Sequence, residues 1–268
     1  MGVVSVKGSP GATTAGLGIA AGWPTGAGVL VEADPAGGDV AARFGLGAGP
    51  GVASMAVAAR HRDRAVVDAS GWARLLPLGV QVVPAGAGAA AGAALSALAG
   101  HGRRLLSTLA AGGVVVVDAG RWWPGSPADE LLSACAVVLL VARPVLEQVR
   151  QCEVRVDGLR RLVPDVRLLL VAGRGGWPAG EVGAVLGLPV AGVLPVDEQG
   201  AGVLAGRLVP RGGWAGGGVW SWARLPLPRA CHSVALRLAG TAPPGLPDGG
   251  GAVGRVPVWR TPLEREVA

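Results

Sequence analysis

Near the N-terminus, glycines and hydroxyl residues are spaced in a way that could bind phosphate. The stretch Lys7-Gly8-Ser9-Pro10-Gly11-Ala12-Thr13-Thr14 follows a short apolar run and precedes a helix-like pattern. Glycines let backbone N–H groups converge on a phosphate, and the start of a helix adds partial positive charge. The hydroxyl of Thr13 stands where a Mg²⁺ ligand is expected. We therefore predict that residues 7–14 bind the phosphates of a nucleotide.

Lys7 is the single lysine in a chain with 24 lysine and arginine residues. The chain also lacks asparagine, which is typical of a GC-rich coding sequence, so the absence of a residue type is weak evidence. A lysine kept at the start of this loop is best explained by contact with an anion, although a surface lysine kept by chance is the alternative. Ala12 occupies the position at which phosphate-binding loops carry their lysine.

Asp118 follows four valines, and Asp34 follows the expected strand 28–33, which is apolar except for Glu32. In open α/β sheets, ligands bind beyond the carboxyl ends of the strands, so we expect both carboxylates to lie near the loop. Each could instead cap a turn, but the ligand-facing position favours the site. For Asp39 we expect a helix cap. Arg121 could equally reach a phosphate or lie in solvent.

Short β-branched runs alternate with segments of helical length along the chain. Strands are expected at 3–6, 28–33, 80–83, 114–118, 136–141, 166–172 and 190–194. Continuous apolar strands separated by helices are typical of a parallel sheet that is covered on both faces. We therefore predict an α/β fold with a doubly wound, mostly parallel sheet flanked by helices on both faces.

The length of 268 residues fits one α/β domain followed by a tail. We assign residues 1–239 to the domain, with a glycine- and tryptophan-rich loop at about 209–226. A last helix is expected from about Arg229 to Leu238. Residues 240–268 are rich in proline and glycine, so we expect a mostly disordered tail.

Five tryptophans lie in glycine- or proline-rich surroundings, namely Trp122, Trp123, Trp214, Trp220 and Trp222. Exposed tryptophans of this kind anchor partner proteins. Tryptophans that fold back on their own domain are at least an equal alternative.

Composition excludes several other functions. The net charge of +6 comes from scattered arginines, so solvated helix faces explain it, while non-specific DNA binding stays open as an alternative. The three cysteines are isolated, which argues against a disulfide framework or a zinc site and favours a reducing compartment. The first expected strand starts at residue 3, and no apolar run could cross a bilayer, so we expect a soluble, cytoplasmic protein with no integral membrane segment.

Four stretches together resemble the ParA/MinD family of deviant Walker-A P-loop ATPases. Residues 7–14 resemble the family's loop K-G-G-x-G-K-T-T, and residues 29–39 resemble its first switch segment, V-L-x-x-D-x-D-P-x-G-G-D. Residues 114–120 resemble the Walker B strand and second switch, and residues 188–197 resemble the late segment L-G-x-P-V-x-G-x-I-P-x-D. The resemblance covers roughly residues 2–208 in the family's order, and it implies the fold predicted above.

The resemblance also implies roles for single residues. In the family, residues equivalent to 7–14 hold ATP, and the early lysine, here Lys7, reaches across a dimer interface to the partner's nucleotide. Asp34 matches the aspartate that helps to set up the attacking water, so Lys7 and Asp34 are the expected catalytic residues. Thr13 and Asp118 match the positions around Mg²⁺. Glu32 replaces the first acid of the switch segment, and the late segment closes the nucleotide pocket in the family.

Two departures from the family pattern affect function. Ala12 replaces the lysine that bridges the β- and γ-phosphates, and Gly173 stands where family members carry an asparagine that reads adenine. A charged hydrogen bond contributes about 1.5–3 kcal/mol, so ATP should bind ten- to a hundredfold more weakly, with a larger loss in turnover. Binding with slow or lost hydrolysis is expected, and whether the chain is an enzyme, or prefers ATP to GTP, stays open.

Two functions fit these residues. The first is a nucleotide-dependent switch, in which ATP holds a homodimer together and a protein partner links it to a cargo, either a chromosome region or pilus or secretion machinery. The pilus-associated, CpaE/TadZ-like branch tolerates degenerate loops and is the more natural home. The second is a pseudo-ATPase scaffold that acts by partner binding alone. A dinucleotide site is disfavoured because Gly8, Gly11 and Gly16 do not form G-x-G-x-x-G, and no G-x-S-x-G elbow is present.

Overall fold

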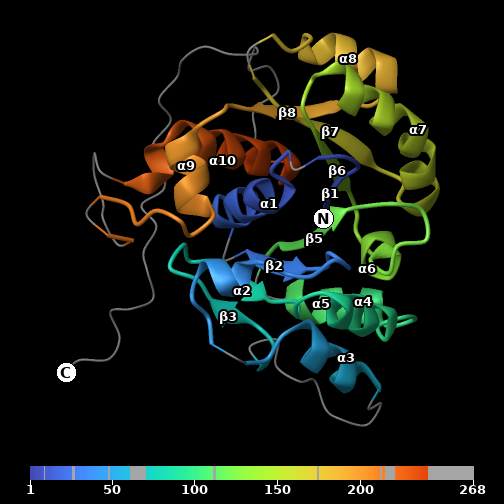
Figure 1. The fold of residues 1–268 in the computed structure, drawn as a ribbon, viewed down its shortest axis with the longest axis vertical. Coiled ribbons are helices and arrows are strands. Elements are labelled where there is room, and N and C mark those ends of the chain that lie inside the picture. Colours follow the sequence, from blue (N-terminus) through green and yellow to red (C-terminus); the bar gives the residue numbers. More distant parts are fainter. Residues whose placement is uncertain are drawn as a thin grey trace.

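The structure, a computed structural model, describes residues 1–8, 10–25, 28–47, 49–60, 71–110, 113–173, 175–211, 213–214 and 221–240. Within these residues the chain forms an eight-stranded sheet in the order β3-β4-β2-β5-β1-β6-β7-β8 (Figure 1). The strands are β1 (Gly2–Ser5), β2 (Val29–Glu32), β3 (Arg74–Leu75), β4 (Gln81–Val83), β5 (Val115–Arg121), β6 (Val138–Ala142), β7 (Val166–Val171) and β8 (Val190–Leu194). Neighbouring strands are parallel except β3 and β4, which are antiparallel.

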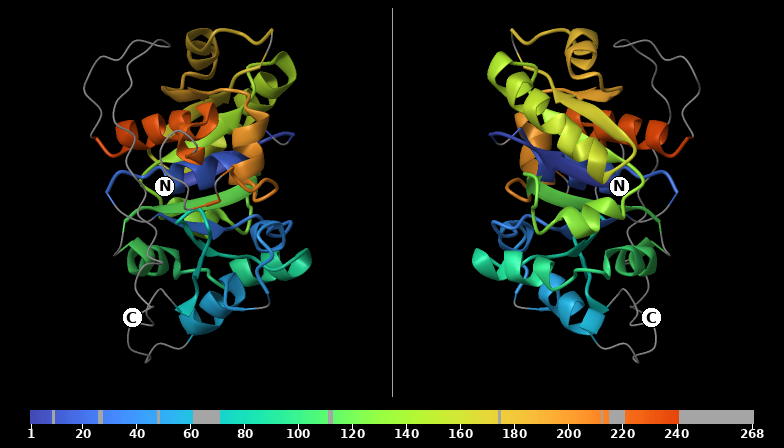
Figure 2. Two further views of the ribbon diagram at one scale, coloured as in Figure 1. Left: turned by 90° about the vertical axis from the view of Figure 1, so that its left-hand side faces the viewer. Right: turned by 90° about the vertical axis from the view of Figure 1, so that its right-hand side faces the viewer.

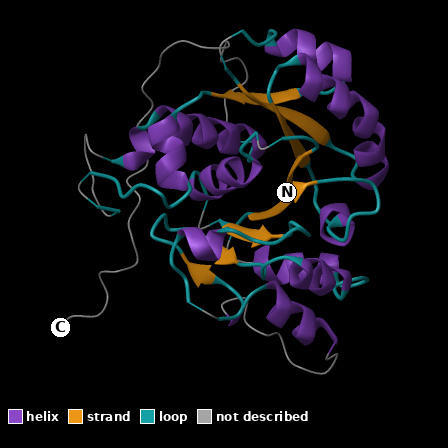
Figure 3. Cartoon of the chain, in the orientation of Figure 1, coloured by secondary structure: helices purple, strands orange, loops and turns teal. Residues whose placement is uncertain are grey.

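Helices cover both faces of the sheet, as the views in Figures 1, 2 and 3 show. One face is packed by α3 (Val52–Arg60), α4 (Ala89–Ser96), α5 (Gly102–Leu109), α6 (Asp129–Ser133), α7 (Leu146–Leu162) and α8 (Ala179–Leu186). The other is packed by α1 (Ala12–Ala21), α2 (Val40–Arg43), α9 (Glu198–Leu204), the short 3₁₀ helix η4 (Trp222–Arg224) and α10 (Pro226–Leu238). The fold is therefore the predicted doubly wound α/β fold.

Six of the eight strands, β1, β2, β4, β5, β6 and β7, supply both hydrophobic cores. In β2, Val29 and Val31 belong to the core under α3–α8, whereas Leu30 belongs to the core under α1 and α10. In β5, Val116 likewise faces away from its two valine neighbours. A strand that is buried on both faces has no solvent-facing position to fill with a polar side chain, which is why residues 29–31 and 115–117 are continuously apolar.

The seven predicted strands are all present. The two-residue strand β3 was not predicted, because such a short pairing leaves no periodic pattern. Helix α10 begins at Pro226, before the expected start at Arg229, since a proline is well tolerated in the first turn of a helix. Residues 241–268 and most of the central part of the loop 209–226 lie outside the described residues, so the domain boundary and the tail stay predictions.

Three of the five tryptophans fold back on the domain. Trp122 and Trp222 are buried, and Trp214 packs on the single phenylalanine with ring centroids 6.2 Å apart. Trp123 is 41 % exposed, and Trp220 lies outside the described residues. The three cysteines are buried and free. In the described part of the chain, no helix is long and apolar enough to cross a membrane.

The order of the central strands places the expected site. Strand β5 lies between β2 and β1, and all three are parallel, so their carboxyl ends share one edge of the sheet. The loop after β1 carries Lys7, the loop after β2 carries Asp34, and β5 itself carries Asp118, which pairs in register with Glu32 at the end of β2. Ligands of doubly wound sheets bind at this edge.

Candidate functional site

The loop between β1 and α1 has a backbone shape that glycine adopts far more readily than other residues. Gly8 has φ of 70° and Gly11 has φ of 99°, both in the left-handed region. Gly11 is the N-cap residue of α1. No described side chain makes a capping hydrogen bond to this helix, and the first turn of the helix contains no acidic residue. The first N–H groups of α1 therefore remain available, and the helix dipole favours an anion there. Ser9 lies outside the described residues.

Thr13 and Asp118 meet at the start of α1. Asp118 is only 3 % exposed, and its Oδ1 accepts a hydrogen bond from the N–H of Gly120 at 3.1 Å. Burial raises the pKa of Asp118 to about 6, while hydrogen bonds from the Thr13 side chain and from Gly120 act in the opposite direction. The structure thus brings together a hydroxyl and a carboxylate that the sequence assigns to Mg²⁺, a role that stays a prediction.

These residues fit a Mg²⁺ ion only in company with a nucleotide. The described residues contain no group of three or more His, Cys, Asp or Glu side chains that could hold a metal ion by themselves. Mg²⁺ is commonly held by one or two carboxylates together with substrate phosphates and water. Thr13 and Asp118, next to the open start of α1, match that donor set.

Asp34 lies two residues after the end of β2 and contacts Gly120 and Arg121 at the end of β5. Its Oδ1 accepts a hydrogen bond from the N–H of Ala36 at 2.8 Å, and the backbone of Arg121 also bonds to it. A Cβ on Gly120 would stand 1.8 Å from Oδ2 of Asp34, so only a glycine permits this approach. Burial raises the pKa of Asp34, and the charge of Arg121 lowers it. Asp34, Thr13 and Asp118 therefore converge on one edge of the sheet.

Glu32 binds backbone N–H groups, a role that could not be predicted from the sequence. Its carboxylate is 3 % exposed and accepts hydrogen bonds from the N–H groups of Asp39 at 2.8 Å, Val40 at 2.9 Å and Ala85 at 3.1 Å. Burial raises the pKa of Glu32, and the hydrogen bonds lower it. A Cβ on Gly38 would stand 2.4 Å from Oε2 of Glu32, so that glycine makes room for the carboxylate. Glu32 holds the backbone of residues 38–40 in place.

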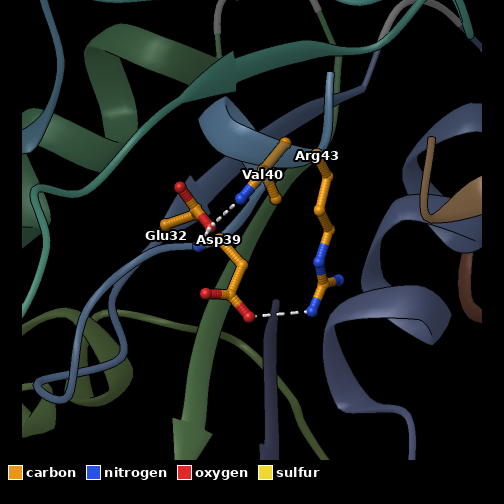
Figure 4. A network of polar contacts seen from close by, with 4 residues as sticks. All are labelled: Glu32, Asp39, Val40 and Arg43. Carbon is orange, nitrogen blue, oxygen red and sulfur yellow. Dashed lines mark hydrogen bonds and ion pairs between the residues drawn. The ribbon is translucent and has the colours of Figure 1, made fainter. Parts of the chain in front are cut away.

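Asp39 takes the expected position at the start of a helix, but the expected side-chain cap is absent. Asp39 is the N-cap residue of α2 by position, but its side chain makes no capping hydrogen bond. Its Oδ2 instead accepts a hydrogen bond from the Arg43 guanidinium at 2.9 Å, while Glu32 bonds the backbone at this end of α2 (Figure 4). Arg43, one helical turn after Asp39, binds the carboxylate that would otherwise have capped the helix, because side chains at positions i and i+4 face each other on a helix.

Lys7 and Gln148 flank the loop. Lys7 is exposed and forms no ion pair with a carboxylate among the described residues. Gln148, in the first turn of α7, places Nε2 3.3 Å from the position that a Cβ on Gly8 would take, and its Oε1 accepts from the N–H of Arg143 at 2.8 Å. Gln148 was missed because a single glutamine far along the chain belongs to no motif.

The late segment at residues 188–197 forms β8 and then caps a helix. Asp197 accepts hydrogen bonds from the N–H of Gly200 at 2.9 Å, in α9, and from that of Leu227 at 3.0 Å, in α10. Its carboxylate thus joins α9 to α10, and closure of a nucleotide pocket by this segment stays a prediction. Gly173 is exposed, and nothing lies within 4 Å of the position its Cβ would take.

The sequence matches no protein-family model, and a search of curated proteins finds no match. Solved structures do match. A ParA family ATPase from Chlorobium tepidum is similar with a TM-score of 0.67 and 17% identity, over 88% of this chain and 97% of that chain. The septum site-determining protein MinD of Pyrococcus horikoshii, solved with Mg-ADP, has a TM-score of 0.65 and 15% identity, over 88% and 94%.

A third match is a chain of the MinC:MinD cell division protein complex of Aquifex aeolicus, with a TM-score of 0.65 and 15% identity, over 92% of this chain and 99% of that chain. The chain has the ParA/MinD-like P-loop fold. At these low identities the likeness establishes the fold alone, so the activity depends on the residues described above.

Proposed function

We propose that this chain is a nucleotide-dependent molecular switch that binds ATP with Mg²⁺ at residues 7–14. The observation that carries the proposal is the open N-terminus of α1, with Thr13 in hydrogen-bonding contact with the buried Asp118. Exposed N–H groups at a helix start suit a phosphate, and the neighbouring hydroxyl and carboxylate suit its divalent cation. The solved MinD with Mg-ADP, which has the same fold, supports the choice of ligand.

Each residue of the site has a role in this proposal. The backbone of residues 8–14 holds the phosphates, and Thr13 and Asp118 hold Mg²⁺, which would neutralise charge on the phosphate oxygens. Asp34 orients the attacking water from the second strand end. Lys7 is exposed and unpaired among the described residues, which leaves it available for a phosphate bound in a second subunit.

We further propose that hydrolysis is slow or lost. Ala12 is 7% exposed and carries no charge, so the loop lacks a cation at the position where such loops stabilise the transferring phosphate. ATP would then hold two subunits together for a long time. The chain is in this proposal a weak ATPase at most.

For the cargo, we propose only its class, a protein partner. The MinC:MinD complex shows that a protein with this fold assembles with another protein, so we propose a protein partner for this chain as well. The degenerate loop favours the pilus-associated, CpaE/TadZ-like branch over chromosome partitioning, and a cytoplasmic location suits both.

Calorimetric titration tests the proposal. Wild-type protein should bind Mg-ATP, and Asp118→Asn and Thr13→Val should each weaken binding by about tenfold, since each removes one ligand of the cation. Asp157→Asn, on the exposed face of α7, is the matched control and should bind as wild type does. Equal affinity in all four proteins would mean that the nucleotide does not use this site.

A pseudo-ATPase scaffold is the second candidate. Ala12 and Gly173 favour it, because one removes the cation of the loop and the other leaves no side chain to read a base. If wild-type protein binds neither Mg-ATP nor Mg-GTP in the same titration, the scaffold replaces the switch.

A further inference from the structure

Arg43 ends helix α2 and carries a cation to the edge of the sheet that holds the site. Its guanidinium donates to the Asp39 carboxylate at 2.9 Å, and its side chain is only 27% exposed. Figure 4 shows both side chains of this pair leaving α2 on the side of helix α1. The charge of Arg43 is also among the causes that lower the pKa of Asp118, which bonds to Thr13. Arg43 therefore lies near the proposed phosphate and Mg²⁺ site.

The backbone of Arg43 is held from two sides. At the start of α2, the Glu32 carboxylate bonds the N–H groups of Asp39 and Val40. At its end, the carbonyl oxygen of Arg43 lies 2.9 Å from the position that a Cβ on Gly206 would take, so the chain after α9 approaches it closely. The guanidinium thus projects from a fixed point, which lowers the entropic cost of binding a ligand.

The site needs a cation in addition to Mg²⁺. Asp34 and Asp118 contribute negative charge, and Ala12 gives the loop none of the positive charge that a polyphosphate attracts. Arginine suits this need, because its planar guanidinium stays ionised and bonds two phosphate oxygens at once. Arg121 is the other arginine whose charge acts on a site carboxylate, but its side chain is exposed, whereas Asp39 already holds the half-buried guanidinium of Arg43 in one position.

We propose that Arg43 binds the phosphates of the nucleotide within its own subunit and supplies the positive charge that Ala12 cannot. This inference depends on the proposed nucleotide site. In the free protein Asp39 holds the guanidinium, and on binding Arg43 exchanges that carboxylate for a phosphate oxygen. Asp39 is 69% exposed, so its carboxylate returns to water at little cost.

Because Arg43 exchanges one partner for the other, substitutions of Arg43 and of Asp39 should change the affinity for Mg-ATP in opposite directions. Arg43→Ala should weaken Mg-ATP binding about ten- to a hundredfold, since it removes a charged bond to phosphate. Asp39→Asn should tighten binding by up to about fivefold, since the guanidinium no longer leaves a carboxylate. If Arg43 served only to stabilise α2, both substitutions would break the same pair and both would weaken binding.

The test is a titration of each variant with Mg-ATP, Mg-ADP and AMP. The loss caused by Arg43→Ala should shrink as phosphates are removed, and Arg43→Lys should restore part of the affinity. Arg150→Ala is the matched control, because Arg150 also pairs with an acid on its own helix, Glu153, at 2.8 Å, on an exposed face of α7. Arg43→Gln, which keeps the stem of the side chain, replaces Arg43→Ala if the latter unfolds by circular dichroism.

The outcomes separate this inference from the proposed function. If wild-type protein binds no nucleotide, the proposed function fails and the inference fails with it. If wild type binds but Arg43→Ala binds equally well, or if Arg121→Ala alone removes binding, only the role of Arg43 is overturned. Weaker binding in both Arg43→Ala and Asp39→Asn overturns it too.

Discussion

Asp118 is an ionisable residue at a place where its charge is costly. Its pKa is about 6 in the folded protein against an ordinary value of 3.8, chiefly because the carboxylate is buried. The folded chain therefore binds this proton more tightly than the unfolded chain does between these two values. The contribution of Asp118 to stability falls as the pH rises through that window, and the cost is fully present above about pH 6.

Asp118→Asn should consequently stabilise the free protein at pH 7.5, by on the order of 1–3 kcal/mol. The asparagine oxygen can still accept from the N–H of Gly120, and the ionised form is no longer buried. The gain should narrow as the pH is lowered from 6 toward 4, where wild type is itself protonated. Urea unfolding across this range is the measurement.

Asp157→Asn is the control, because Asp157 makes only an exposed ion pair with Arg160 at 3.5 Å, and at pH 7.5 it should change the unfolding free energy by less than about 0.5 kcal/mol. A loss of stability in Asp118→Asn at pH 7.5 would show that the hydrogen bonds to the carboxylate outweigh its burial. Greater stability combined with weaker Mg-ATP binding is the pattern of a residue kept for its ligand.

Among the elements, α2 is too short to be stable alone and depends on its attachment to Glu32. Helices of this length do not form in water without tertiary contacts. The carboxylate joins β2, the start of α2 and the loop after β4 through three hydrogen bonds. The position of residues 34–43 is thus set from the end of a buried strand.

Glu32→Ala should lower the free energy of unfolding by roughly 3 kcal/mol or more, because three N–H groups lose a charged acceptor. Hydrogen exchange should speed up at the amides of Asp39, Val40 and Ala85 and through residues 34–43. Mass spectrometry of the exchanged peptides reads both regions.

Glu130→Ala is the control for that substitution, because Glu130 bonds a single backbone N–H, that of Gly102, at 2.9 Å. It should cost less and should leave exchange at residues 34–43 as in wild type. Unchanged exchange in Glu32→Ala would mean that the packing of Val40 holds α2 without the carboxylate.

For the whole molecule, the proposed switch predicts self-association that depends on both nucleotide and Lys7. Lys7→Ala should bind Mg-ATP about as well as wild type but should dimerise about tenfold more weakly in its presence, because the lost contact crosses between subunits. Sedimentation velocity with a slowly hydrolysed ATP analogue measures this. Arg103→Ala, on the exposed side of α5, should dimerise normally, and an ATP-dependent dimer of undiminished strength in Lys7→Ala would exclude the contact.

Much of this architecture could be predicted from the sequence, because strands buried on both faces leave long apolar runs. The approach of Thr13 to Asp118 was predictable for a related reason, since the predicted strand 114–118 ends at the same edge of the sheet as the strand before the loop. In the structure β5 continues to Arg121, so Asp118 lies within the strand. Both inferences use only chain order and the geometry of regular elements.

The contacts that could not be predicted involve loops and helix ends, whose positions do not follow from the geometry of regular elements. The carboxylate of Glu32 bonds backbone N–H groups, which every residue carries, so no residue type marks its partners. Gln148 reaches Gly8 from a helix that lies far along the chain, and the Asp39–Arg43 pair replaced a cap that was equally compatible with the sequence. The side-chain chemistry was visible in the sequence, but the choice among partners was not.

Because Gly120 has no Cβ, the segment that carries Asp34 packs directly against the end of β5. Asp34 fills the space in which a Cβ would stand, and the Ser5 hydroxyl bonds the carbonyl of Gly120 at 3.2 Å. The segment after β2 and the end of β5 are thus in direct contact, beside the end of β1, the strand that leads into the phosphate loop. A displacement of either segment must be transmitted to the other, so the two would respond to a ligand as a single moving part.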